Sequence, residues 1–346
     1  MEAGYAVSGQ IVGVDLHRRR SVIVRMDAIT GEQLGCVRID NSRARLVAEV
    51  VKAGPAPKVA IEATFGWYWA VDALHAAGAE VHLAHPRGMV GMNDRRVKND
   101  ERDARELADL LRVNRFAEAY IAPPALRELR ELVRWRQKLV DHRRSVKASL
   151  HAVRGKCGIV PELGDMFGPG GQKILDSLAL PEPYASRVHC QRRQLAQLDH
   201  EIGGVEIATV ARLKDDPDFQ ALLKLRGIGP VFASIFLAEI GDISRFATPQ
   251  ALACWAGLTP IHRESDLKAH RGSISKQGSR LLRWALIEAC QRSCEPYVAQ
   301  AKTNIVARRG RKAVNIAKVA AARRLATIVF YVLRDGEARC LQQQAA

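Results

Sequence analysis

Residues 10–15 read QIVGVD, a short apolar run that ends in the carboxylate of Asp15. A run of this length and composition is typical of a buried β-strand. Two more strands are predicted at Val22–Met26 and Leu34–Ile39, with a turn at Asp27–Gly31 between them. Three strands joined by such tight links predict a meander at the start of the chain.

The residues that follow extend this sheet and place helices between its strands. The predicted elements are a helix capped by Asn41 and Ser42 that runs to Ala53, a strand at Lys58–Glu62, a helix at 66–77 and a strand at Glu80–Ala84. With a helix predicted to start at Asp100, the order is β-β-β-α-β-α-β-α. This is the order of an RNase H-like α/β fold, in which helices cover the faces of a mixed sheet.

The segment that opens this last helix, residues 98–105 (KNDERDAR), is rich in charge. Asp100 and Asp103 are three residues apart, so their carboxylates share one face of a helix. Asp100 is expected to be the helix N-cap, with Asp103 at the third helical position. Taken alone, the pair is explained by capping and by compensation of the helix dipole.

Asp15 and Glu62 both lie at predicted strand ends, where binding sites form in open α/β sheets. If Asp100 and Asp103 join them, four carboxylates converge and repel one another unless a cation neutralises them. Oxygen ligands without cysteine or histidine favour Mg²⁺ or Mn²⁺. Metal pairs held by carboxylates about 4 Å apart can activate an attacking oxygen and stabilise a leaving one in phosphodiester chemistry. The sequence therefore predicts a metal site.

Composition and charge narrow the class of protein. The chain has 346 residues, of which 47% are hydrophobic and 5% aromatic, which favours a helix-rich globular protein long enough for two cores. A net charge of +16 points to a polyanionic partner, nucleic acid before membrane. No apolar run approaches the roughly 20 residues of a membrane span. The seven cysteines have no CxxC pair and are interpreted as reduced, mostly buried thiols of a cytoplasmic protein.

The middle of the chain predicts two long helices, Ala125–Arg154 and Pro183–Leu213, after a linker at Ile121–Pro124. They favour either an intramolecular hairpin or an intermolecular coiled coil, and the pattern leaves both open. The first helix has a basic face that is expected to contact nucleic acid: Arg127, Arg130, Arg134, Lys138, Arg143, Arg144 and Lys147. The predicted domains are therefore residues 1–120, a helical coiled-coil region at 121–215, and 216–346.

The C-terminal third is predicted to be mainly helical and to contact phosphates. Arg226-Gly227-Ile228-Gly229 before a helix is typical of a helix-hairpin-helix, whose exposed amides can receive phosphate oxygens. Residues 257–278 are polar and glycine-punctuated, and predict a phosphate-binding loop with four basic residues: Arg263, Lys268, Arg271 and Lys276. The last predicted helix, Lys312–Arg334, follows a basic cluster formed by Arg308, Arg309, Arg311 and Lys312.

Hydroxyls in the same segment are candidate nucleophiles, because neighbouring Arg, Lys and His lower the cost of ionising a serine. The residues alone do not separate Ser265, Ser273, Ser275 and Ser279. A loop that grips phosphate without covalent chemistry is the alternative.

Four pieces of sequence carry, in order, a resemblance to a known family: VGVD ending at Asp15, IEATFGWY with Glu62, KNDERDARELADLL with Asp100 and Asp103, and LRGIGP followed by ALACWAGLTPIHRES and RGSISKQGSRLLRWAL. From residue 10 to residue 335 the chain resembles the DEDD insertion-sequence transposases related to the Piv invertases, described as bridge-RNA-guided recombinases. Phe65, Trp67 and Trp69 differ from the glycine, threonine and tyrosine that are commoner in this family after the residue matching Glu62.

The resemblance implies a RuvC-like N-terminal domain, a coiled-coil linker and a C-terminal transposase domain with a nucleophilic serine. Carried over, the acidic tetrad is Asp15, Glu62, Asp100 and Asp103, and the serine is Ser265, ahead of Ser273 and Ser275. It implies a Mg²⁺-dependent (or Mn²⁺-dependent) recombinase of a bacterial mobile element that forms a 5′-phosphoserine.

Its implied partners are donor and target DNA, a structured bridge RNA, and further copies of the chain. Dimers would pair into a tetramer with composite active sites. Two other readings stay open: a metal nuclease of the Holliday-junction-resolvase type that uses water, and a catalytically silent nucleic-acid-binding protein.

Overall fold

The computed structural model describes residues 9–85, 99–159, 166–177, 179–265, 268–293 and 295–337. The chain divides into two compact units, Met1–Ile121 and Ala122–Ala346. Within the described ranges, no helix is long and apolar enough to cross a membrane.

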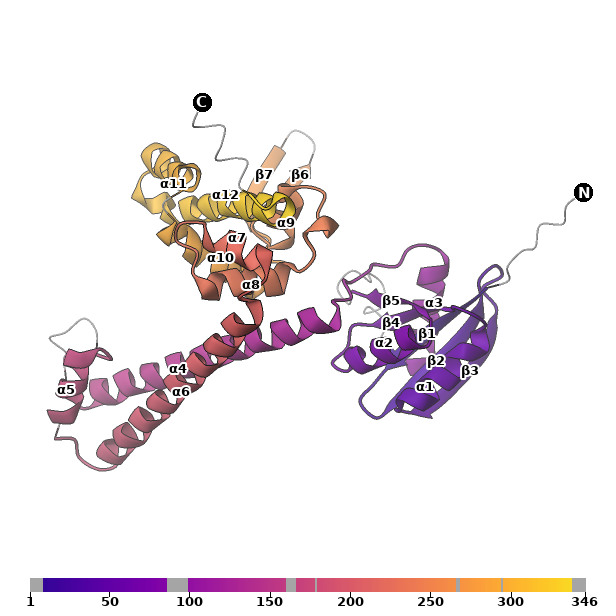
Figure 1. Ribbon diagram of the computed structural model, residues 1–346, viewed down its shortest axis with the longest axis horizontal. Helices are drawn as coiled ribbons and strands as arrows, with labels where there is room; N and C mark the ends of the chain where they lie inside the picture. The colour runs from indigo at the N-terminus through magenta and orange to yellow at the C-terminus, as the bar shows by residue number, and fades with distance from the viewer. Residues whose placement is uncertain are drawn as a thin grey trace, which may run out of the picture. The chain divides into compact units, whose positions relative to one another are not determined.

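The first unit is built on a five-stranded mixed sheet of order β3-β2-β1-β4-β5 (Figure 1). Its strands are β1 (Gln10–Leu16), β2 (Arg20–Asp27), β3 (Gln33–Asp40), β4 (Lys58–Glu62) and β5 (Glu80–Ala84). β1, β2 and β3 form the antiparallel meander, and β4 pairs in parallel with both β1 and β5. The predicted RNase H-like order of strands is confirmed.

Helices cover the sheet of the first unit: α1 (Arg43–Val50), continued by η1 (Val51–Ala53), α2 (Trp67–Ala76) and α3 (Asp100–Arg112). Alternate residues of a strand face opposite sides. Val12, Val14 and Leu16 accordingly pack into one core with residues of α1 and α2, whereas the alternate residues of β1 face α3. Gly13 allows the close approach of α3, because a Cβ there would lie 1.8 Å from the carbonyl oxygen of Ala104.

The second unit begins with two long helices, α4 (Pro124–Lys156) and α6 (Tyr184–Leu213), with the short helix α5 (Pro169–Ser177) between them in sequence. Arg136 pairs with Glu206 and Arg143 with Asp199, so residue numbers rise along α4 as they fall along α6. The helices are therefore antiparallel partners within one chain (Figure 1).

The predicted basic face of α4 is partly wrong. Arg130 Nε donates to the carbonyl oxygen of Ala238 at 2.7 Å, and Arg134 holds the carboxylate of Glu239 at 2.8 and 3.1 Å. Arg127 is buried. Arg127 and Arg130 face the packed side of α4 because the helix contacts α8 (Pro230–Ile240) as well as α6, whereas Arg134 is half-exposed and reaches Glu239 from the edge.

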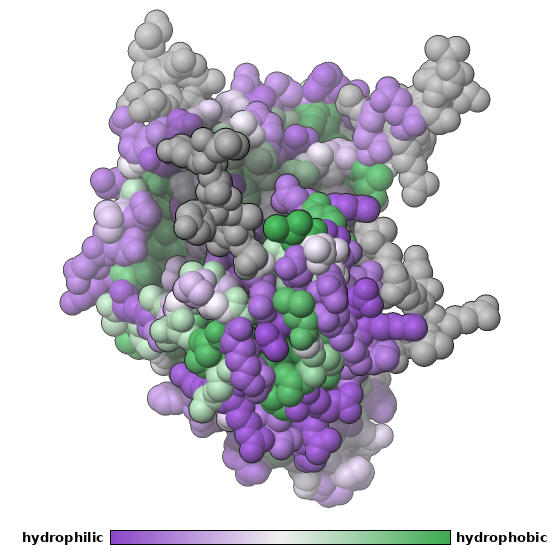
Figure 2. All heavy atoms as spheres, turned by 90° about the vertical axis from the view of Figure 1, so that its right-hand side faces the viewer, coloured by the Kyte–Doolittle hydropathy of each residue, from purple (hydrophilic) through white to green (hydrophobic). Residues whose placement is uncertain are grey.

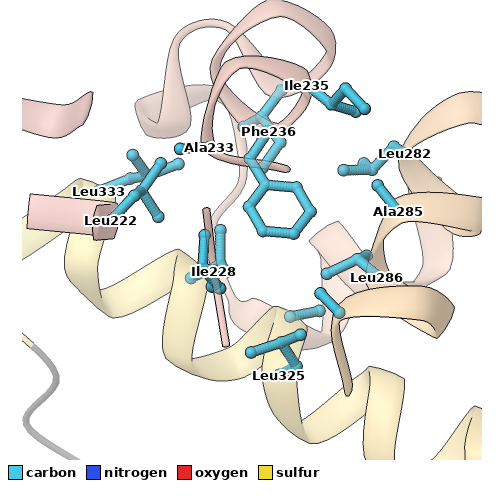
Figure 3. Close-up of a cluster of buried hydrophobic side chains, with 14 of the residues drawn as sticks. Leu222, Ile228, Ala233, Ile235, Phe236, Leu282, Ala285, Leu286, Leu325 and Leu333 are labelled. Atoms are coloured by element: carbon cyan, nitrogen blue, oxygen red, sulfur yellow. The ribbon is translucent and has the colours of Figure 1, made fainter. Parts of the chain in front are cut away.

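The rest of the second unit is a helical body whose other helices are α7 (Pro217–Leu223), α9 (Pro249–Trp255), α10 (Arg280–Arg292), α11 (Pro296–Arg309) and α12 (Val314–Asp335), with the one-turn helices η2 (Ile243–Arg245) and η3 (Arg311–Ala313). Phe236, Leu286 and Leu325 from α8, α10 and α12 meet in its core (Figure 3). The predicted, mainly helical C-terminal part is confirmed.

The segment predicted as a loop is instead a β-hairpin of β6 (Pro260–Ser265) and β7 (Lys268–Ile274). Its sequence is polar and shows no apolar alternation, so the pattern did not predict strands. The cysteine prediction is also wrong in part. Cys36, Cys190 and Cys254 are exposed free thiols, and Cys290 is buried, which raises the pKa of its thiol to about 11.

Hydrophilic side chains cover much of the molecular face in Figure 2, and apolar side chains lie between them in small groups. This surface agrees with the high charge of the sequence, 53 Lys and Arg against 37 Asp and Glu.

Candidate active site

The candidate site is built around Asp15, near the end of the central strand β1. Its side chain lies on the face of β1 that α3 covers, and the residue is only 4% exposed. Because Gly13 lets α3 lie against β1, the acidic first turn of the helix comes over this strand end.

The start of α3 corrects the predicted cap. Asn99, not Asp100, is the N-cap, and its side chain accepts a hydrogen bond from Glu101 N at 3.1 Å. Asp100 is the first helical residue, and Asp103 N donates to Asn99 O at 3.0 Å. Since the asparagine caps the helix, neither aspartate carboxylate is used as the cap.

The other three predicted carboxylates all affect the pKa of Asp15. The pKa of Asp15 is raised above its usual value, mainly by burial. His17 opposes this rise, and the negative charges of Asp100, Asp103 and Glu62 add to it. Glu62 is the last residue of β4, the parallel neighbour of β1. The sheet and the first turn of α3 thus place Glu62, Asp100 and Asp103 where their charges affect Asp15.

Sequence reasoning missed His17, which follows Asp15 by two residues. His17 Nε2 lies 3.0 Å from Asp15 Oδ2 and 3.5 Å from Asp100 Oδ1. The carbonyl oxygen of His17 accepts a hydrogen bond from Asn41 Nδ2 at 2.6 Å, which fixes the end of β1. Ligand-type atoms of Asp15, His17 and Asp100 lie within 4.8 Å of one another, a candidate metal site.

The residues fit a divalent cation. Asp15 Oδ2 is buried and accepts no hydrogen bond, in spite of the nearby imidazole. A buried carboxylate oxygen that accepts no hydrogen bond is costly, and three further carboxylates increase the repulsion. One nearby cation is Arg38, whose Nη2 is 3.5 Å from Asp100 Oδ2 on the more exposed side of the cluster. A ligand set of carboxylate oxygens with one imidazole is one that divalent metal ions accept.

The candidate serines lie in and after the hairpin of the second unit. Ser265 is the last residue of β6 and pairs in register with Lys268, the first of β7; its side chain lies outside what the structure describes. Ser273 is in β7. Ser279 has a structural task, because its hydroxyl accepts a hydrogen bond from Leu282 N at 3.1 Å and caps α10. Arg263 and Arg271 are also in the hairpin, but the structure does not describe their side chains.

The predicted phosphate-binding turn joins α7 to α8. Arg226 is exposed, and Gly229 is the N-cap of α8. Gly227 has φ +87°, and a Cβ there would lie 2.7 Å from the carbonyl oxygen of Arg292. This glycine is therefore required by the close packing of the turn on the end of α10, whether or not phosphate is bound.

The predicted basic cluster is confined to one short stretch. Arg308, Arg309, Arg311 and Lys312 are all exposed around Gly310, where α11 ends. Within the described parts of the chain, none of the four forms an ion pair. Lys276 is also exposed, in the left-handed conformation with φ +55°. Arg308 Nε donates to the carbonyl oxygen of Asn304 at 3.2 Å, and the exposed cations of this cluster can contact an anionic partner.

Comparison with protein families gives two matches in this chain. A model of DEDD transposases of the IS110 type, described as "Transposase", matches residues 12–153, which include all four carboxylates. A model described as "Transposase IS116/IS110/IS902 family" matches residues 219–303, which include the hairpin.

Similar curated proteins are bacterial. A "Probable family 20 transposase" of Pseudomonas aeruginosa is 26% identical over 279 residues, 77% of this chain and 80% of that protein. "Putative transposase y4pF/y4sB" of Sinorhizobium fredii is 24% identical, over 95% of this chain and 85% of its own. The "Transposase for insertion sequence element IS1111A" of Coxiella burnetii is 27% identical, over 70% of this chain and 69% of that protein.

Proposed function

We propose that the chain is a DEDD transposase of the IS110/IS116/IS902 family, as the two family matches support, and that its four N-terminal carboxylates and Ser265 cut and rejoin DNA strands. The observation that carries the proposal is the convergence of the carboxylates on Asp15, whose buried Oδ2 accepts no hydrogen bond. Transposases act on DNA, so donor and target DNA are the substrates.

Asp15, Glu62, Asp100 and Asp103 would hold Mg²⁺ or Mn²⁺, with His17 as a further ligand. When bound, such ions polarise the scissile phosphate and stabilise charge on the attacking and leaving oxygens. The protein's contribution is to hold the carboxylates in place: the cap at Asn99 fixes the first turn of α3, and Gly13 sets its distance from β1.

Ser265 would supply the attacking hydroxyl. Its Oγ loses a proton and bonds to phosphorus while the bond from phosphorus to the 3′ oxygen breaks, and that oxygen takes up a proton. The products are a 5′-phosphoserine and a free 3′-hydroxyl. A 3′-hydroxyl of another strand then attacks the phosphoserine and releases Ser265. One phosphodiester is exchanged for another, so no ATP is needed.

The proposal extends to partners. The residues that would contact nucleic acid are Arg226, Gly227, Gly229, Arg263, Lys268, Arg271, Lys276, Arg308, Arg309, Arg311 and Lys312. Support comes from the net charge of +16 and from the exposed cluster around Gly310, which forms no ion pair within the described residues. A structured bridge RNA would select the sites by base pairing, while the protein contacts backbone and shape.

We also infer that the chain self-associates. Dimers formed through α4 and α6 would pair into a tetramer. The exposed apolar residues Trp135 and Ile207, one on each helix, support a contact there beyond the hairpin itself.

A denaturing gel with nicked DNA that carries the element's ends tests the proposal. We expect a DNA-linked protein band in the wild type that depends on Mg²⁺ and is absent from Ser265→Ala and Asp15→Asn. Ser273→Ala, in the same hairpin, is the matched control and should retain the band. Cleavage that continues undiminished in Ser265→Ala would show hydrolysis by water, as in a resolvase-type nuclease.

A further inference from the structure

One aromatic side chain of the first unit does not contribute to the core. Phe65 is 105% exposed, more than any other large hydrophobic residue among the described ones; Ile207 follows at 73%. Single exposed apolar residues are common on proteins and need no special role. What sets Phe65 apart is its place, three residues after Glu62 in the loop from β4 to α2.

The loop that carries Phe65 is held in place by hydrogen bonds. Thr64 Oγ1 donates to the carbonyl oxygen of Leu16 at 3.2 Å, and Thr64 N donates to Glu62 O at 2.8 Å. Ala63 N donates to Ala84 O at 3.2 Å. The residues before Phe65 are thus tied to the ends of β1, β4 and β5. The phenyl ring therefore extends into solvent from an anchored backbone at the carboxylate end of the sheet.

Positive charge lies at the same end of the sheet. Leu16, to which the loop is tied, is followed by His17 and by Arg18 and Arg19 in the turn to β2. Both arginines are exposed, and neither forms an ion pair within the part of the chain that the structure describes. Cations for a phosphate backbone and a flat aromatic face together are what proteins use to hold unpaired nucleic-acid strands.

We propose that Phe65 stacks on an unpaired base of the DNA strand whose phosphate the carboxylate cluster engages, and that Arg18 and Arg19 contact the backbone beside it. The inference rests on the proposed function. An aromatic ring stacks on any base, so the contact would hold a strand end without reading its sequence. It would also stop the frayed base from returning to its helix, as inserted apolar side chains do elsewhere.

Photocrosslinking tests this directly. Forked DNA with 5-iododeoxyuridine at its first unpaired position is irradiated with the full-length protein, and the crosslinked peptide is identified by mass spectrometry. We expect crosslinking at Phe65 in the wild type and at the new ring in Phe65→Tyr. Phe65→Leu, which keeps an apolar side chain but no ring, should lose the crosslink and bind the fork about 5- to 100-fold more weakly.

Ile29→Ala is the control, because Ile29 is 66% exposed on the same unit, in the turn after β2, away from the end that carries Asp15. It should bind as the wild type does, and all variants should keep the wild-type Tm. The stacking contact is contradicted if the protein binds the forked DNA without a crosslink at Phe65, or if Phe65 crosslinks to RNA alone. In either case Mg²⁺-dependent cleavage that requires Asp15 would leave the proposed function intact. If that cleavage is missing too, the function itself has failed.

Discussion

Two buried carboxylates, one in each unit, have opposite surroundings. Asp15 is 4% exposed and Glu239 is 3% exposed. Burial would raise the pKa of Glu239, but the hydrogen bonds and charge of Arg134, with Ser279 and Arg130, bring it below its usual value. The pKa of Asp15 is raised by burial and by three neighbouring carboxylates, with only His17 opposing. Glu239 forms a completed ion pair with Arg134, whereas the four carboxylates around Asp15 exceed the positive charge that Arg38 brings near them. That deficit indicates a site for a cation.

The largest expected effect is on catalysis at the incomplete site. Asp15→Asn should lower the rate of metal-dependent strand cleavage at least about 1000-fold, because the loss of a metal ligand removes several kcal/mol of transition-state stabilisation. Asp109→Asn is the control: Asp109 is on α3 and pairs with Arg112 at 2.7 Å, outside the cluster. Single-turnover cleavage of labelled DNA measures both, and similar rates for the two variants would contradict the role of Asp15.

The completed ion pair should matter for stability instead. Glu239→Gln should lower the free energy of unfolding by about 3 kcal/mol, since it leaves Arg134 without its buried partner. Asp141→Asn, which removes an exposed pair with Arg144 on α4, should cost less than about 1 kcal/mol. Urea unfolding followed by circular dichroism compares them. A loss no greater for Glu239→Gln than for the control would mean that the buried pair is not stabilising.

A smaller effect is expected at His17. His17→Asn should weaken Mn²⁺ binding about 10-fold, as the loss of a secondary ligand or orienting group does in metal sites. The Mn²⁺-loaded wild type should also show nitrogen coupling in its electron spin echo spectrum, and the variant should not. Nitrogen coupling that persists in His17→Asn would exclude this histidine as a ligand.

The pH dependence of stability should differ in sign between the two sites in metal-free protein. The raised folded-state pKa of Asp15 means that the folded protein binds the proton more tightly, so stability falls as pH rises through the interval between its unfolded and folded values. The lowered pKa of Glu239 gives stability that is present above its unfolded value and is lost as pH falls toward its folded value. Asp15→Asn should therefore raise Tm slightly near neutral pH, and Glu239→Gln should lower it. Changes of the same sign would contradict the comparison.

The sequence could predict the elements that depend on interactions between residues close together in the chain. Strands β4 and β5 match the predicted residues, because each is a short apolar run that starts just after a helix breaker, Gly54–Pro57 before β4 and Gly78 before β5. The helix start at Asp100 was ambiguous locally, since Asn99 and Asp100 are both good caps. In the folded chain Asn99 is the cap.

Other features depend on contacts between distant residues. His17 meets Asp100 only after the sheet and α3 are assembled, and no spacing in the sequence marks it. Arg134 and Glu239 are 105 positions apart, so a basic face of α4 looked available to nucleic acid when part of it is turned inward. The hairpin escaped prediction because neither of its faces has an apolar stripe.

The central claim is that the cluster around Asp15 holds a divalent cation. Calorimetric titration of the full-length protein with Mn²⁺ tests it most directly, with wild type, Asp15→Asn and Asp109→Asn compared under the same conditions. The account predicts equal binding by wild type and Asp109→Asn, and binding at least about 100-fold weaker by Asp15→Asn. Binding of Mn²⁺ by Asp15→Asn with wild-type affinity would contradict it.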